Sequence, residues 1–287
     1  LLPDDPWRDL FFDYYQIEAN GNWEAGKNIL HRSESLSAFA ERQPVPLHEL
    51  ENAFGEMENP LLAARRQRAA PALDNKILLS WNALMITAYA KCGQALQRPD
   101  YLDRAKQKMT FLLNNLQREQ TTFAHSWKNG PSTQEAFLDD YAALIEALLA
   151  LFETTQQKTY LRKAADLMDM VRTRFLDEDT KMFYFTPAGQ KDTVVRKKDL
   201  YDSAVPSGNA TMCLNLSMLG RYLGRADLRE QAFTMIVQMQ EALQRFPTSF
   251  ARWARCFMAQ VFPGPEVAIV GQNWSDILED MQRVYWP

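Results

Sequence analysis

The sequence predicts an all-α protein built as an (α/α) toroid of helical hairpins, here incomplete, with short β-ribbons at one end of the helices. Three observations predict this fold. A segment repeats three times without gaps, each repeat contains one apolar and one amphipathic helix, and the links between repeats carry strand-type alternation. Stacked helical hairpins of this kind form solenoids or closed toroids.

The repeats begin at Ser80, Asp139 and Ser207, with "SWNALMITAYAKCG", "DDYAALIEALLALF" and "SGNATMCLNLSMLG". Each repeat opens with a residue type that favours helix N-caps, and each has an alanine at the fourth position. Turn-forming residues interrupt each repeat at the same place, and a second helical pattern follows. The repeats therefore predict three hairpins, over residues 76–118, 137–177 and 207–244.

The two helices of each hairpin differ in their apolar pattern. Residues 144–151, "LIEALLAL", are apolar almost all round, which is typical of a helix buried on most sides. The second helix of the first repeat has an apolar stripe that includes Leu102 and Met109, with Arg104 and Lys108 on the other side. An inner helix thus alternates with an outer one. With flanking helices in 1–70 and 248–287, we expect a single toroid domain over 1–287.

Composition excludes several classes of function. The 287 residues carry a net charge of −4 and no basic stripe, which argues against nucleic acid and membrane surfaces as partners. No apolar run approaches the roughly 18 residues of a membrane span. The three cysteines are far apart, and the sequence contains no zinc-binding motif, no HExxH motif and no P-loop. We therefore expect no metal or cofactor and a reducing, cytoplasmic location. The chain starts without methionine, so we expect it to be part of a longer protein.

The candidate site lies where the inner helices begin. The three starts must lie at one end of the bundle, and the long ribbon links lie at the same end, where loops often carry function. Carboxylates, amides and aromatic rings gather there, a combination that suits a polyhydroxylated ligand. The candidate binding residues are Asp74, Trp81, Asn82, Tyr141, Tyr201, Ser207 and Asn209.

Three residues are candidates for acid–base chemistry. Capping alone explains Asp139, whereas the repeat does not require a carboxylate at Asp140 and no cap requires Asp202. We therefore predict that Asp202 points into the same cavity as Asp140, although a structural role remains the alternative for both. His125, on the first ribbon, is the one histidine placed near this end of the bundle.

Four stretches resemble a known family. They are "YYQIEANGNWEAGKNILH", "DNKILLSWNALMITAYAK", "AFLDDYAALIEALLALFE" and "YDSAVPSGNATM", and they are similar to the thioredoxin-domain-containing, spermatogenesis-associated protein family. The resemblance implies a thioredoxin-like domain followed by a six-hairpin toroid, similar to N-acylglucosamine 2-epimerases and several glycosidases. It also implies that this thioredoxin-like domain, in the same longer chain, is a partner.

Two classes of function follow. One is a carbohydrate-active enzyme, either an N-acylglucosamine 2-epimerase-like isomerase or a glycosidase-like hydrolase. The other is a non-catalytic binding or scaffold domain that works with the thioredoxin-like domain. Epimerases of this fold use histidines at the toroid mouth, and this chain has only His125 there. Carboxylate-based sugar chemistry and binding without chemistry therefore both stay open. A deep cavity with two facing carboxylates favours an enzyme, and a filled mouth favours a scaffold.

Overall fold

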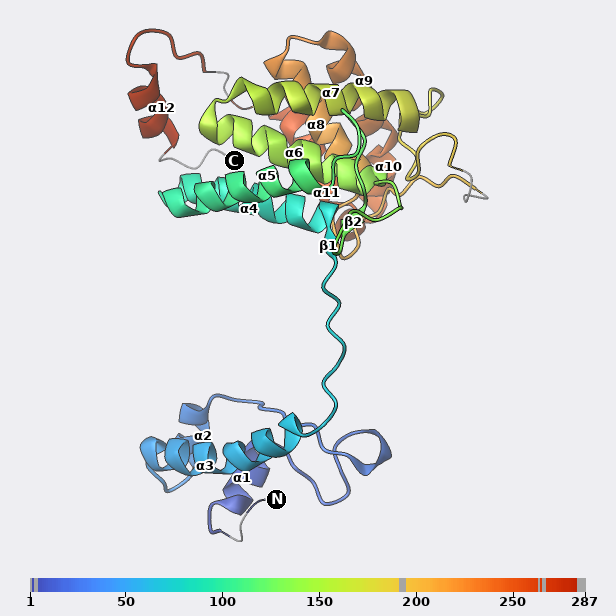
Figure 1. The fold of residues 1–287 in the computed structure, drawn as a ribbon. Coiled ribbons are helices and arrows are strands. Elements are labelled where there is room, and N and C mark those ends of the chain that lie inside the picture. Colours follow the sequence, from blue (N-terminus) through green and yellow to red (C-terminus); the bar gives the residue numbers. More distant parts are fainter. Residues whose placement is uncertain (1, 3–4, 191–194, 263, 265–266, 283–287) are drawn as a thin grey trace. The chain divides into compact units, whose positions relative to one another are not determined.

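The chain forms two compact units, Leu1–Asp74 and Asn75–Pro287, in the computed structural model (Figure 1). The structure describes residue 2 and residues 5–190, 195–262, 264 and 267–282. This division differs from the single domain expected over 1–287, because the first unit encloses a core of its own.

The first unit contains two short α-helices and one long one around an aromatic core. Its helices are α1 (Arg8–Tyr14), η1 (Glu24–Gly26), α2 (Leu36–Arg42) and α3 (Leu47–Arg66). Phe11 packs edge-on against Phe54, with ring centroids 5.3 Å apart. Tyr14 lies 5.1 Å from Phe39 by the same measure. Aromatic side chains from all three α-helices thus stabilise this unit.

The second unit contains three successive helical hairpins (Figure 1). Each hairpin lies within the range that the sequence predicts. The pairs are α4 (Leu79–Ala95) with α5 (Pro99–Asn115), α6 (Leu138–Thr155) with α7 (Lys158–Phe175), and α8 (Gly208–Tyr222) with α9 (Ala226–Gln238). The helices that follow are α10 (Gln240–Arg245), η2 (Pro247–Ser249), α11 (Ala251–Val261) and α12 (Trp274–Gln282).

Helix α6 is the centre of the second unit. It contacts α4, α7 and α8, and Leu144, Leu148 and Leu151 are fully buried. Its outer partner α7 buries one face only, which includes Leu167 and Val171. The inner and outer helices predicted from the apolar pattern are therefore present, and burial of α6 supplies much of the core.

The hairpin turns lie at the end opposite the starts of α4, α6 and α8. Each turn contains a residue with positive φ: 51° at Gln97, 57° at Gln156 and 65° at Gly224. A left-handed residue reverses the chain sharply after a helix, which keeps these connections short. The long links are consequently all at the other end, near the starts of the inner helices.

The first long link forms the predicted ribbon. Strand β2 (Ser126–Trp127) pairs antiparallel with β1 (Ile77–Leu78), directly before α4, and isolated bridges continue the ribbon on either side of β2. In the second link, the bridge between Leu176 and Phe183 is the only one within the described residues, and 191–194 lie outside them. The first ribbon therefore fixes the main chain of residue 125 beside the start of α4.

Candidate functional site

A cavity of about 120 Å³ lies where α4, α6 and α8 begin. It is partly open to solvent. Among its lining residues are Ser80, Trp81, His125, Phe137, Asp139, Asp140, Phe185, Pro206, Gly208 and Thr211. The three helix starts therefore lie at one end, as the repeat predicts, and the two long links complete the wall.

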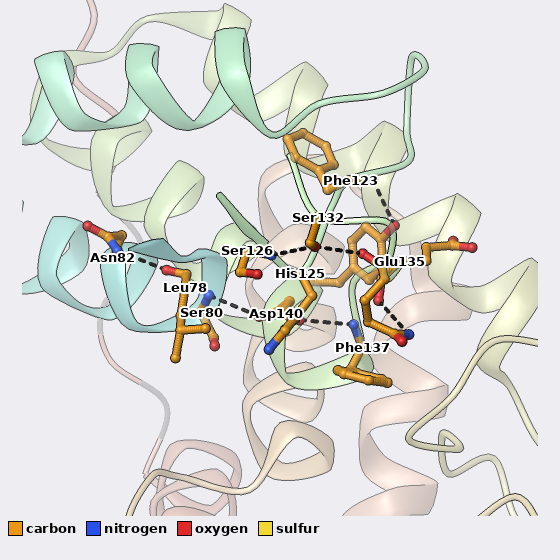
Figure 2. A network of polar contacts seen from close by, with 12 residues as sticks. Leu78, Ser80, Asn82, Phe123, His125, Ser126, Ser132, Glu135, Phe137 and Asp140 are labelled. Carbon is orange, nitrogen blue, oxygen red and sulfur yellow. Dashed lines mark hydrogen bonds and ion pairs between the residues drawn. The ribbon is translucent and has the colours of Figure 1, made fainter. Parts of the chain in front are cut away.

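Asp140 connects three segments at the wall of this cavity (Figure 2). Its side chain is only 1% exposed. Oδ1 accepts the main-chain N–H of Ser80 at 3.0 Å, and Oδ2 accepts that of Phe137, also at 3.0 Å. Oδ2 also lies 2.7 Å from Nδ1 of His125. One carboxylate thus caps α4 and α6 and orients the imidazole.

The ribbon brings His125 to the helix starts. Its carbonyl accepts the N–H of Leu79 at 3.0 Å, which fixes its main chain against α4. The ring packs edge-on against Phe137 at 5.1 Å, and Phe137 stacks on Phe185 at 4.7 Å. The hydrogen bond to Asp140 raises the pKa of His125, and burial opposes that rise. Within the described residues Nε2 has no protein partner, so it is available to a ligand.

Asp139 is the second carboxylate in the cavity. Its Oδ1 is buried and finds no hydrogen-bond partner among the residues that the structure describes. Burial, followed by the charges of Asp140 and Asp199, raises the pKa of Asp139 to about 6. The main-chain N–H of Gly208 and the dipole of α6 act in the opposite direction. Gly208 is required here, because a Cβ would lie 2.0 Å from Oδ1 of Asp139.

Asp139 therefore has a different role from the one predicted. Helix α6 begins at Leu138, so Asp139 is not its N-cap, and Asp140 accepts the N–H of Phe137 instead. Ser80 is likewise inside α4, which begins at Leu79. Ser207 alone caps its helix as expected, accepting the N–H of Ala210 at 3.3 Å.

The position of Asp202 differs from the prediction that it points into the same cavity as Asp140. Its Oδ1 accepts the N–H of Ser207 at 2.8 Å and its Oδ2 accepts that of Arg252 at 2.7 Å. Asp202 thus caps α11 and fixes the approach to α8, and it is not among the residues that line the cavity. The prediction that no cap requires Asp202 is wrong, because the second N–H comes from a helix far along the chain.

Replacing Asp202 with asparagine should therefore destabilise the fold and leave ligand affinity unchanged. The amide has one acceptor oxygen, so one main-chain N–H would lose its partner and face an NH₂ group. We expect a loss of about 1–3 kcal/mol in the free energy of unfolding, measured by urea denaturation. Unchanged stability with weaker ligand binding would contradict this structural role.

The predicted binding residues divide into two groups. Trp81 lines the cavity and is 63% exposed, so its ring is free to stack on a ligand. Tyr141 and Asn209 are fully buried and bond the main chain of Phe123 and Phe183, respectively. They position the links and do not line the cavity.

The remaining predicted residues also lie outside the cavity lining. Asn82 donates to the carbonyl of Leu78 at 2.9 Å. Tyr201 is 67% exposed and lies beside the ring of Phe250. Asp74 is exposed at the end of the first unit. Sequence reasoning missed Phe137 and Phe185; the position of Phe137 next to a predicted helix start would have been a signal, whereas Phe185 lies in the middle of the second long link, far from a helix start.

The part of the chain that the structure describes holds no group of three or more His, Cys, Asp or Glu suited to a metal ion. Within the same residues, every helix falls short of the length or apolarity that a membrane crossing requires.

The raised pKa of Asp139 has a consequence for stability. A carboxyl with a folded pKa of about 6, against an ordinary 3.8, binds its proton more tightly when the protein is folded. Its contribution is therefore most favourable below about pH 4 and is lost as the pH rises through 6. Asp139→Asn should raise the free energy of unfolding at pH 7.5 by about 1–2 kcal/mol and leave it unchanged near pH 4. Destabilisation at pH 7.5, measured by thermal unfolding, would contradict this.

A family model, N-acylglucosamine 2-epimerase (GlcNAc 2-epimerase), matches residues 64–204. The chain is 28% identical over 288 residues to Uncharacterized protein B0495.5 of Caenorhabditis elegans, covering 95% of this chain and 39% of that protein. It is 27% identical over 276 residues to Spermatogenesis-associated protein 20 of Homo sapiens, and the match covers 91% of this chain and 35% of that protein. The chain thus spans less than two fifths of the length of these relatives.

Two solved structures are similar in fold. The structure of D-mannose isomerase matches with a TM-score of 0.52 and 12% identity, over 73% of this chain and 58% of that one. The GH76 α-mannanase of Bacteroides thetaiotaomicron matches with a TM-score of 0.50 and 12% identity, over 74% and 59%. The predicted (α/α) toroid architecture is thereby confirmed, and the family model and the relatives both support the resemblance to spermatogenesis-associated proteins.

Proposed function

We propose that the second unit binds a small carbohydrate in the cavity and transfers a proton to and from it through His125. The observation that carries the proposal is the hydrogen bond between Nδ1 of His125 and Oδ2 of Asp140, 2.7 Å long, at the cavity wall. The match to the epimerase family model and the fold shared with an isomerase and a mannanase support a sugar as the ligand.

The geometry gives each residue a role. Asp140 accepts the Nδ1 proton of neutral His125, so that Nε2 keeps its lone pair for the ligand. Because the same bond raises the pKa of His125, the imidazole is a stronger base than a free one, which suits it to remove a proton from carbon. Trp81, exposed at the rim, offers a face on which a sugar ring stacks.

This arrangement favours an epimerase-like reaction over a hydrolase-like one. Glycosidases use two carboxyl groups on opposite sides of the scissile bond. Here both oxygens of Asp140 and both oxygens of Asp202 are engaged by the protein itself. Asp139 is the one remaining carboxylate among the lining residues. A histidine base that removes a proton from the carbon beside a sugar carbonyl needs no carboxylate pair.

Solvent exchange tests the proposal. Each of glucose, mannose, N-acetylglucosamine, N-acetylmannosamine and cellobiose is incubated with the protein in D₂O, and loss of the C2 hydrogen signal is followed by proton NMR. We expect enzyme-dependent exchange with at least one of these sugars. If none of them binds or exchanges, the carbohydrate proposal is refuted.

A second candidate is a non-catalytic domain that presents a bound sugar to a thioredoxin-like domain of the same longer chain. It is favoured by the complete engagement of Asp140 and by the size of the cavity, about 120 Å³ against roughly 300–1,000 Å³ for typical ligand sites. The relatives, more than twice as long as this chain, have room for another domain. Sugar binding without any exchange in D₂O would support this alternative.

A further inference from the structure

We propose that the cavity selects a sugar bearing a free amino group, whose ammonium pairs with the carboxylate of Asp139. This inference rests on the proposed sugar-binding function and adds the chemical class of the ligand. It is carried by three features of the site: its charge, the use of its N–H donors, and the unpartnered oxygen of Asp139.

The charge of the lining is negative. Among its residues the ionisable ones are Asp139, Asp140 and His125, and neither lysine nor arginine is present. Both oxygens of Asp140 accept hydrogen bonds from the protein, and one of them lies beside His125. A positive charge on a protonated His125 would therefore neutralise the charge of Asp140 and not that of Asp139. The charge of Asp139 then stays without a partner of opposite sign in the cavity wall.

Several of the N–H groups that would bind a ligand anion are already in use. Helix starts favour anions through their free N–H groups and their dipoles. Here Asp140 accepts the N–H groups of Ser80 and Phe137, and the N–H of Gly208 acts on Asp139. The protein's own carboxylates thus occupy the positions that a phosphate or carboxylate of the ligand would take. Phosphorylated and acidic sugars are consequently disfavoured.

The carboxylate of Asp139 belongs to the cavity wall, and its charge is what a ligand can compensate. Its Oδ1 is buried beside Gly208 and has no hydrogen-bond partner among the described residues, which is costly for a carboxylate. A hydroxyl would supply one hydrogen bond, whereas an ammonium supplies a hydrogen bond and the missing positive charge. The raised pKa of Asp139 agrees with this lack of compensation.

Amine binding should depend on pH in a characteristic way. Below about pH 6, the value to which the pKa of Asp139 is raised, an ammonium must displace the proton of Asp139. Protonated His125 opposes the ammonium at low pH as well, while the charges of Asp140 and Asp199 favour it. Affinity for the amine should therefore fall by about 10-fold for each pH unit below 6. Affinity for an uncharged sugar should not follow this curve.

Calorimetry with matched methyl glycosides tests the inference, because they bind without ring opening. The probes are methyl glycosides in the gluco and manno configurations with a free amino, an N-acetyl or a hydroxyl group at C2. At pH 7 we expect at least one amine to bind about 10-fold or more tightly than its two counterparts. Asp139→Asn should remove this preference, and Trp81→Ala should weaken all three probes alike.

The outcomes are distinguishable. Neutral glycosides that bind as well as the amines would overturn the amino-sugar inference and leave the sugar-binding function standing. An amine preference that persists in Asp139→Asn would also overturn it. Binding of none of the glycosides would overturn the amino-sugar inference, whereas the sugar-binding function is decided separately by the C2 exchange of free sugars in D₂O. Because Asp139→Asn is expected to stabilise the fold at neutral pH, lost binding in this variant would not reflect unfolding.

Discussion

His125→Gln should lower the rate of sugar proton exchange by about 10²–10⁴-fold, the usual contribution of a positioned general base. Glutamine can still donate to Asp140, so the polar contacts of the wall are largely kept, but an amide cannot accept a proton from carbon. The measurement is the C2 hydrogen exchange in D₂O described above, with thermal unfolding to show that the variant is folded.

The pH dependence of the exchange rate tests the role of His125 independently. Because the bond to Asp140 raises the pKa of His125, the wild-type rate should fall as the pH drops through a value above 6.5. His48→Gln is the matched control, since His48 is exposed in the first unit and should leave the rate unchanged. A His125→Gln variant with the wild-type rate and profile would exclude His125 as the base.

Asp140→Ala should destabilise the second unit by about 3–5 kcal/mol, the largest loss that we expect from a single change at the site. The substitution leaves the N–H groups of Ser80 and Phe137 and the Nδ1 of His125 without their acceptor. Urea denaturation followed by circular dichroism measures the loss. A change below about 1 kcal/mol would contradict the bridging role of this carboxylate.

Asp140→Asn separates the structural role from the role in catalysis. Its amide oxygen can still accept one N–H, so the loss of stability should be smaller than in the alanine variant. The negative charge beside His125 is gone, so its pKa should fall relative to wild type, as followed by NMR titration of the ring protons. An unchanged pKa of His125 would show that Asp140 does not tune the imidazole.

The sequence predicts the hairpins well because their signal is local. Inner and outer helices differ in apolar periodicity, and that difference survives in every repeat. The prediction that Asp139 rather than Asp140 caps its helix differs from the structure for an equally local reason. The pattern predicts that each inner helix begins at its polar residue, whereas α6 begins one residue earlier, at Leu138. This places Asp140 at the third helical position, from which its side chain reaches back to the N–H of Phe137.

Asp202 shows what a local pattern cannot reveal. One of its two acceptor bonds goes to Arg252, fifty residues along the chain, and α11 comes to it only when the bundle assembles. The free oxygen of Asp139 is likewise a product of packing, because Gly208 on another helix leaves the space for it. Capping rules describe one helix at a time, and these carboxylates lie between helices.

The separation of short turns from long links has a consequence for engineering. Residues 96–98, 156–157 and 223–225 reverse the chain at one end of the bundle, while His125 and Phe185 are carried by the links at the other. Fluorophores or fusion partners attached at those turns would report on the protein without disturbing its chemistry. Conversely, grafting residues 116–137 and 176–207 from a relative would exchange the part of the cavity wall that the links supply, while the helices and their lining residues stay the same.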